Sequence, residues 1–152
     1  MIARRLARPL LAASFINGGI DTLRNPGPRV KLAEPVVEKV AEPAPLPGDT
    51  DQLVKVNAVV QVVGGALLAL GKFRRLAAVA LAVSLVPTTL AGHPFWEKED
   101  PAEQSQQRTQ FAKNMGLLGG LILAALDTEG APSLGWRARR AAHKAREALP
   151  IG

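Results

Sequence analysis

Amide and ionisable side chains lie inside stretches of this sequence that are otherwise apolar, and they are the groups best placed to do chemistry. They are Asn17, Asp21, Lys55, Asn57, Gln61, Lys113 and Asn114. An ionisable side chain in hydrocarbon costs roughly 2.5 to 3.5 kcal/mol on insertion scales, so it normally faces a bundle interior, a cavity or the interface. These groups gather toward one half of their segments, and we expect any polar site to lie there.

Helical spacing places several of these groups on shared faces. Asn17 and Asp21 are four residues apart, as are Asn57 and Gln61, so each pair would be neighbours on a helix. Glycine pairs that let helix backbones approach occur in the same segments: Gly64 with Gly65, and Gly116 with Gly120. In the first of two interpretations, the amides hold helices together at about 0.6 kcal/mol each, and the lysines extend toward the interface.

The second interpretation is a polar pocket that opens on the outer side of a membrane. Asp21 would pair with Lys55 or Lys113, and His93 with Trp96 would stand at the mouth. Such a pocket would receive a quinone head group or a small polar solute. A single histidine at a membrane edge also has a simpler role, a hydrogen bond to a loop carbonyl.

Composition excludes several chemistries. The chain has no cysteine, so it supplies no disulfide, thiolate nucleophile, iron–sulfur ligand or cysteine zinc site. His93 and His143 fall on opposite sides of the four-span arrangement derived below, so they would not jointly bind a haem or a metal. No Ser/His/Asp set or glycine-rich phosphate loop occurs. We expect no metal site, while the catalytic residues and any enzymatic activity stay open.

Four apolar segments, each about 16 to 18 residues long, must position these side chains. They are Leu6 to Leu23, Leu53 to Leu70, Leu76 to Ala91 and Phe111 to Leu126. A crossing of the hydrocarbon core needs about 20 apolar residues. The alternative, a soluble four-helix bundle, would need a polar outer face on every helix, and the stretch VNAVVQVVGGALLALG of the second segment supplies only Asn57 and Gln61. The pattern predicts an all-α fold: an integral membrane antiparallel four-helix bundle, with residues 1–152 as one domain.

Proline, glycine and charge predict the connections. Asn25 to Asp51 is rich in proline, so we expect an irregular outer loop with at most a short helix at Glu34 to Glu42. Gly71 to Arg75 is short enough to force an antiparallel hairpin. Pro94 should end the third segment. Trp136 to Leu149 should form a short amphipathic basic helix on the cytoplasmic face.

The distribution of basic residues predicts the orientation. The net charge is +6, and eleven of the 19 lysines and arginines fall at the N-terminus, between the second and third segments, and in the tail of residues 127–152. Four crossings would place these regions on one side and most acids on the other. The positive-inside rule then predicts a multi-pass plasma-membrane protein with both termini and the tail in the cytoplasm. Nucleic acid is disfavoured as a partner, because only Trp136 interleaves the basic residues.

The N-terminus also has features of a secretory signal, with Arg4, Arg5 and Arg8 before an apolar run. However, Asn17 and Asp21 interrupt that run, and no convincing cleavage site follows them. We therefore expect the first segment to be retained as a helix.

Three stretches, taken together, are specific enough to suggest a family. They are RPLLAASFINGGIDTLRNP near the start, GHPFWE after the third segment, and KNMGLLGGLILAALDTEG followed by PSLGWRARR. They resemble actinobacterial members of the DoxX family of small membrane proteins. The resemblance implies a four-helix membrane bundle and an association with redox, thiol or sulfur metabolism. In some relatives, a DoxD-type subunit takes part in thiosulfate oxidation coupled to quinone reduction.

The resemblance implies a small subunit or partner of a membrane redox system. Its environment would be the lipid bilayer, its partners would be redox enzymes, and a quinone is the candidate cofactor. The alternative is a non-catalytic membrane carrier or scaffold that binds a lipid or small solute. Because cysteine is absent, the chain itself performs no thiol chemistry, and no catalytic residue is transferred from the family.

Overall fold

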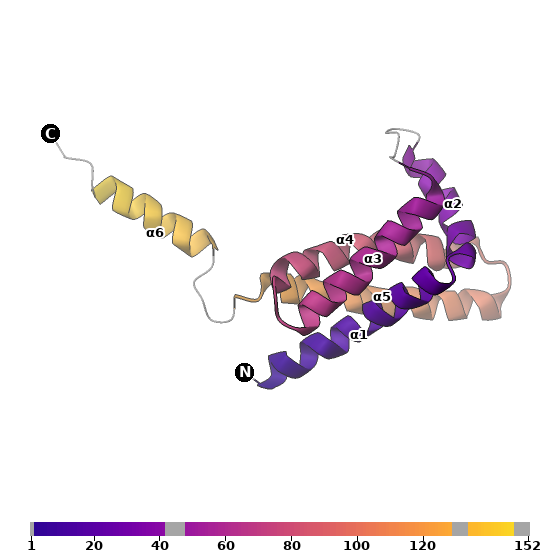
Figure 1. Ribbon diagram of the computed structural model, residues 1–152, viewed down its shortest axis with the longest axis horizontal. Helices are drawn as coiled ribbons and strands as arrows, with labels where there is room; N and C mark the ends of the chain where they lie inside the picture. The colour runs from indigo at the N-terminus through magenta and orange to yellow at the C-terminus, as the bar shows by residue number, and fades with distance from the viewer. Residues whose placement is uncertain (1, 42–47, 129–133, 148–152) are drawn as a thin grey trace.

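The computed structural model describes residues 2–41, 48–128 and 134–147, and most of them are helical (Figure 1). The helices are α1 (Ile2–Arg24), α2 (Gly27–Ala41), α3 (Thr50–Ala69), α4 (Arg74–Gly92), the 3-10 helix η1 (Phe95–Glu97), α5 (Pro101–Leu126) and α6 (Leu134–Glu147). No strand occurs in the described ranges, which confirms the predicted all-α class for them.

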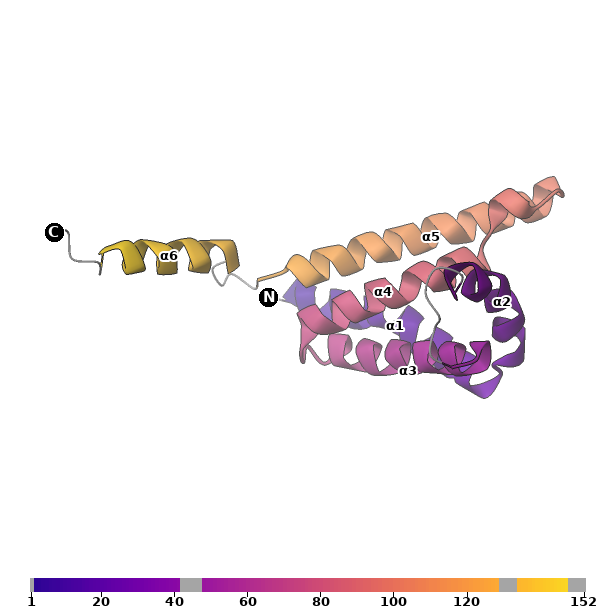
Figure 2. The same cartoon turned by 90° about the horizontal axis from the view of Figure 1, so that it is seen from above.

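Each of the four apolar segments forms a helix, namely α1, α3, α4 and α5. Successive members of this set run in opposite directions, so the N-terminus, the α3–α4 turn and the end of α5 lie at one end of the assembly (Figures 1 and 2). α2 and η1 lie at the other end. α5 begins well before the predicted segment, because the Asp100 side chain accepts a hydrogen bond from Glu103 N at 2.9 Å and Pro101 follows the cap.

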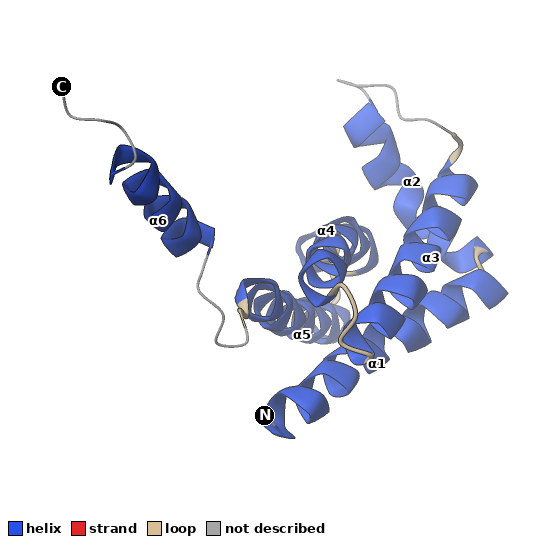
Figure 3. Cartoon of the chain, turned by 60° about the vertical axis from the view of Figure 1, so that its left-hand side comes forward, coloured by secondary structure: helices blue, strands red, loops and turns tan. Residues whose placement is uncertain are grey.

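One hydrophobic core joins α1, α3, α4 and α5. It includes Phe15 of α1, Leu68 of α3, Leu81 of α4 and Leu121 of α5, all of which are buried. α1 packs mainly against α3, and α4 packs against both α3 and α5. Figure 3 looks nearly along α4 and α5 and shows α3 and α1 passing beside them.

α3 and α4 are long and apolar enough to cross a membrane. An 18-residue window within Thr50–Ala69 and another within Arg74–Glu97 have mean hydropathies of 1.5 and 1.6, and only 28% and 33% of these windows is buried inside the protein. Most of their apolar surface therefore faces outward, as at Leu76, which is 71% exposed, and Val83, which is 68% exposed. Among the described helices, α1 and α5 do not meet the same criterion of length and hydropathy.

α2 corrects the prediction for the first connection. The sequence predicts at most a short helix at Glu34 to Glu42, but α2 spans Gly27–Ala41. Pro28 lies in the first turn of the helix, where its missing N–H needs no partner. The backbone N–H groups of Arg29 and Val30 both donate hydrogen bonds to the Pro26 carbonyl oxygen at 2.9 Å. Pro35 lies inside the helix. α2 packs against α3 and α4.

Two predicted chain reversals agree with the structure. α3 and α4 form an antiparallel pair joined through residues 70–73. Gly71 has a φ of 71° in this turn, a conformation that glycine adopts without strain. α4 ends at Gly92, with His93 as its C-cap and Pro94 next, as predicted.

Arginine side chains link the helices at the end that holds the N-terminus. Arg4 Nε and Arg8 Nη2 lie 3.0 and 3.4 Å from Asp127 Oδ2. Arg75 Nε donates a hydrogen bond to Ala125 O at 2.7 Å, which satisfies one of the last carbonyls of α5 with a cation. These contacts join α1 and α4 to the end of α5.

The predicted C-terminal helix is present as α6, which begins slightly before Trp136. The Arg140 guanidinium lies over the Trp136 ring, 4.9 Å from its centroid. The last two residues of the predicted helix, 148 and 149, lie outside the described residues.

Candidate functional site

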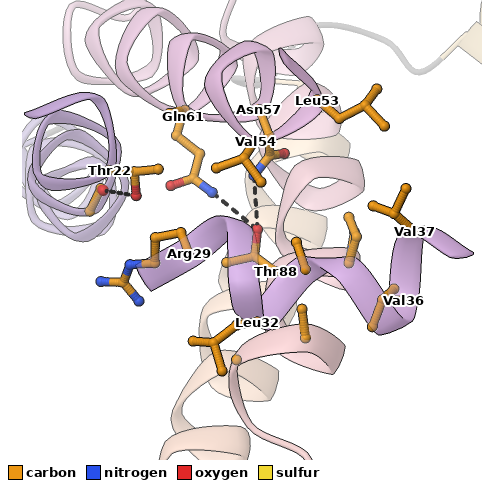
Figure 4. A pocket seen from close by; sticks show the side chains of 16 residues that line it. Thr22, Arg29, Leu32, Val36, Val37, Leu53, Val54, Asn57, Gln61 and Thr88 are labelled. Atoms are coloured by element: carbon orange, nitrogen blue, oxygen red, sulfur yellow. Dashed lines mark hydrogen bonds between the residues drawn. The ribbon is translucent and has the colours of Figure 1, made fainter. Parts of the chain in front are cut away.

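A cavity of about 360 Å³ lies among α1, α2, α3 and α4, toward the end of the protein where α2 is found (Figures 1 and 4). Apolar side chains form most of its wall: Leu32, Val36 and Val37 come from α2, and Leu53 and Val54 come from α3. This volume is near the lower end of the roughly 300 to 1,000 Å³ typical of small-molecule sites. The cavity therefore fits a ring-sized group or a short segment of a longer molecule.

Three polar side chains of the wall form a hydrogen-bonded cluster. Thr88 Oγ1 accepts hydrogen bonds from Asn57 Nδ2 at 2.9 Å and from Gln61 Nε2 at 3.3 Å. The same hydroxyl donates to the Ser84 carbonyl oxygen at 2.8 Å. Figure 4 shows the two amides converging on the threonine from the neighbouring helix. We call Asn57, Gln61 and Thr88 the amide cluster.

Local sequence explains how the amide cluster forms. Asn57 and Gln61 are one helical turn apart, so both side chains project from the same face of α3. The short turn after α3 returns the chain as α4, which brings Thr88 opposite that face. Thr88 bonds back to the carbonyl four residues earlier, as threonine commonly does within helices. Gln61 is 7% exposed, so the cluster reaches into the protein interior.

An ion pair lies at the edge of the cavity. Arg29, which contributes to the cavity wall, donates from Nη2 to Asp21 Oδ2 at 3.2 Å. The two side chains are 48% and 68% exposed, so solvent screens the pair. In Figure 4 the Arg29 guanidinium is directed away from Thr88. Thr22 also lines the cavity and donates its hydroxyl proton to Gly18 O at 2.8 Å.

The ion pairs expected from the sequence are not formed. Asp21 was expected beside Lys55 or Lys113, but its partner is Arg29 on α2. Lys55 Nζ instead lies 2.6 Å from Asp51 Oδ2 one turn earlier, and Lys113 donates to the Gln110 side chain at 3.0 Å. The prediction placed α2 in an irregular loop and so left out the arginine that this helix supplies. Asn17 is exposed on α1 and does not line the cavity.

A second polar group lies between α4 and α5, away from the cavity wall. Asn114 Nδ2 donates to Thr89 Oγ1 at 3.0 Å. His93 Nδ1 lies 2.7 Å from the Gln107 side-chain oxygen, so His93 bonds to a side-chain amide and not to a loop carbonyl. Neither His93 nor Trp96 lines the cavity. Trp96 instead stacks edge-on with Phe95 and Phe111, with ring centroids 5.1 and 6.1 Å away.

The structure therefore separates the predicted polar residues into different places. Asn57 and Gln61 line the cavity, and Asp21 accepts a hydrogen bond from Arg29, which also lines it. The interpretation of the amides as links between helices agrees with the contacts to Thr88 and Thr89. Thr88, Arg29 and the apolar face of α2 are not among the predicted site residues. Thr88 carries a usable signal in the sequence, since Ser84 and Thr88 are one helical turn apart in a segment whose only other hydroxyl residue is Thr89.

The wall of the cavity is mostly apolar and carries a few hydrogen-bonding side chains. No group of three or more histidine or acidic side chains suited to a metal ion occurs in the described part of the chain. Its polar wall offers neutral amides, and its one charged wall residue in the described ranges, Arg29, is balanced by Asp21. Such a wall can orient a hydrogen-bonding group but holds no buried acid or base for proton transfer.

A comparison with protein families matches residues 3–94, more than half of the chain, to the family described as DoxX. The chain belongs to the DoxX family. The matched region contains every residue that lines the cavity, whereas α5 and α6 lie beyond it. The stretch after residue 110 that also resembled DoxX proteins is thus outside the match. Comparisons with curated proteins and with solved structures found no match.

Proposed function

We propose that this DoxX-family protein crosses the plasma membrane four times, through α1, α3, α4 and α5, with both termini in the cytoplasm. Family membership and the outward apolar surface of α3 and α4 support a place in the bilayer. α1 and α5 are less apolar, but they share a core with the other two helices. The arginines at the N-terminal end support the orientation, because cytoplasmic loops are enriched in Lys and Arg.

We further propose that the cavity binds the head group of a small amphipathic molecule, of which a quinone is the best candidate. The observation that carries this proposal is the amide cluster set in an apolar wall. A quinone carbonyl accepts hydrogen bonds, its ring suits the apolar side chains of α2 and α3, and its isoprenoid tail belongs in lipid. Pockets that bind small molecules commonly combine a mostly apolar wall with a few placed polar groups.

In this proposal the protein acts as a small subunit that holds a quinone for a redox partner. The chain has no cysteine, and the described residues offer no metal site, so electrons would come from the partner protein. One observation favours a second candidate, a non-catalytic carrier: the amide cluster contains no titratable group, so it would not move the protons that accompany quinone reduction.

Binding of decylubiquinone to the purified protein in detergent tests the site. Asn57→Leu and Gln61→Leu should each weaken binding about tenfold, since each removes one hydrogen-bonding amide of about 1 to 1.5 kcal/mol. Asn114→Leu is the matched control, because it removes an equivalent amide-to-threonine bond outside the cavity and should leave binding unchanged. Absence of binding to the unmodified chain would refute the proposal, as would equal losses in all three variants.

Electron transfer separates the two candidates. Membranes from cells that produce the chain, with their other proteins present, should reduce added quinone with thiosulfate as the electron donor, and Asn57→Leu should slow the reaction. Binding without any such dependence would favour the carrier.

A further inference from the structure

The hydroxyl in the amide cluster has no hydrogen-bonding capacity left for a ligand. A threonine hydroxyl has one proton to donate and two lone pairs that accept. In Thr88 the proton goes to Ser84 O, and the lone pairs receive Asn57 Nδ2 and Gln61 Nε2. Thr88 therefore positions the amides, and a ligand must be recognised by the amides themselves.

Both amides keep two kinds of unused group. Asn57 and Gln61 each use one N–H on Thr88 and form no other hydrogen bond within the described part of the chain. Each retains a carbonyl oxygen that accepts and a second N–H that donates. A head group that accepts and donates hydrogen bonds can use both, whereas an anion can use only the N–H groups and would lie beside acceptor oxygens with no countercharge.

The cation of the cavity wall is already paired with a carboxylate. Arg29 is the charged residue of the described cavity wall, and its guanidinium is bound to Asp21 and directed away from Thr88 (Figure 4). An anionic head group beside Arg29 would meet the negative charge of Asp21, and one within the amide cluster would lack a countercharge. Burial of an unpaired charge costs several kcal/mol.

We infer that the cavity selects amphiphiles with an uncharged head group and discriminates against anionic lipids, and that Asp21 contributes to this discrimination by pairing with Arg29. The inference rests on the proposed binding function and names its ligand class. Asp21 acts through Arg29, so it is a positioning residue that need not touch the ligand. Removing its charge should leave binding of uncharged ligands intact and admit anions.

Two lipids with the same acyl chains give a direct test. Binding of 1,2-dioctanoylglycerol and of 1,2-dioctanoyl phosphatidic acid to the full chain in neutral detergent is measured by native mass spectrometry. The diglyceride, whose head group is a hydroxyl, should bind at least about tenfold more tightly than the phosphate. Asp21→Asn should narrow that difference about threefold, as expected for an exposed ion pair worth under 1 kcal/mol. Asp51→Asn is the matched control, because the Asp51–Lys55 pair is similarly exposed and does not line the cavity.

The outcomes separate this inference from the function on which it rests. Equal binding of both lipids, or preference for the phosphate, would overturn the selectivity while leaving a binding cavity in place. Equal effects of Asp21→Asn and Asp51→Asn would overturn the role of Asp21. Failure of both lipids to bind while decylubiquinone binds would also overturn the inference, because the ligand class would then be narrower than uncharged amphiphiles. If neither lipid nor decylubiquinone bound, the proposed function would fail together with the inference.

Discussion

A Cβ atom at Gly19 would lie 2.8 Å from the Ala58 carbonyl oxygen and 2.8 Å from Val62 Cγ2. At Gly65 an added Cβ would lie 2.7 Å from Ile16 Cγ1. These distances are far shorter than ordinary van der Waals contact, so both glycines are needed where α1 crosses α3. The close crossing matters for the site, because α1 supplies Gly18 and Thr22 to the cavity wall.

Gly19→Ala should therefore lower the free energy of unfolding by about 1 to 3 kcal/mol, the usual cost of adding a methyl group to a packed interface. The Ala58 carbonyl oxygen belongs to the backbone and cannot move aside, so α1 and α3 would have to separate to make room for the methyl group. Ligand binding should then weaken as well, because α1 forms part of the cavity wall. Thermal unfolding in detergent measures the first effect. Gly116→Ala is the control, since an added Cβ there meets nothing within 4 Å. Equal stability of the two variants would show that α1 and α3 are not so close.

The same comparison shows what sequence can predict about individual residues. Glycine pairs predict close helix packing, and this is correct for Gly65 but not for Gly116, which faces open space. Likewise Asn57 and Gln61 were identified as a polar face, whereas Thr88 was not. The residue types along a helix show which of its faces is polar or lined by small side chains. What that face contacts depends on how the neighbouring helix is rotated, and packing sets that rotation.

At the scale of elements, α2 is the part of the fold that the sequence predicted least well. Proline penalties are local and can be read from the sequence, whereas the contacts of α2 with α3 and α4 join residues that are far apart in the sequence. By contrast, the helices of the four apolar segments were predictable, because a long apolar stretch favours helix in any apolar surrounding. The cavity depends on both kinds of element, and so only its α3 amides were foreseen.

The position of α2 over the cavity can be tested with single cysteines, because the chain has none of its own. Ala33 lines the cavity and the next residue, Glu34, is exposed. A soluble maleimide should label Glu34→Cys at least about tenfold faster than Ala33→Cys, and saturating decylubiquinone should slow only Ala33→Cys. Equal labelling rates in both variants, with or without the quinone, would mean that α2 does not cover the cavity.

At the scale of the whole molecule, charge and apolar surface are arranged along one direction. The end with the N-terminus carries Arg4, Arg8 and Arg75, and the other end carries the acidic first turn of α5. Between the ends, α3 and α4 present apolar side chains outward. A soluble protein rarely exposes so continuous an apolar surface. This arrangement is the physical basis for the proposed four crossings and for their orientation.

The topology predicts which single cysteines are reached from outside an intact cell. Ala102 lies at the start of α5, Phe73 in the α3–α4 turn and Ala142 in α6, and all three are exposed. These substitutions leave every lysine and arginine in place, so the signal for orientation is unchanged. A membrane-impermeant maleimide should label Ala102→Cys in intact cells, and it should label Phe73→Cys and Ala142→Cys only after the membrane is permeabilised.

The reverse labelling pattern would show that the protein has the opposite orientation in the membrane. Labelling of Ala102 and Ala142 from the same side would show an even number of crossings between them, and so would contradict the single crossing by α5. Recovery of the chain in the soluble fraction would refute the membrane assignment altogether.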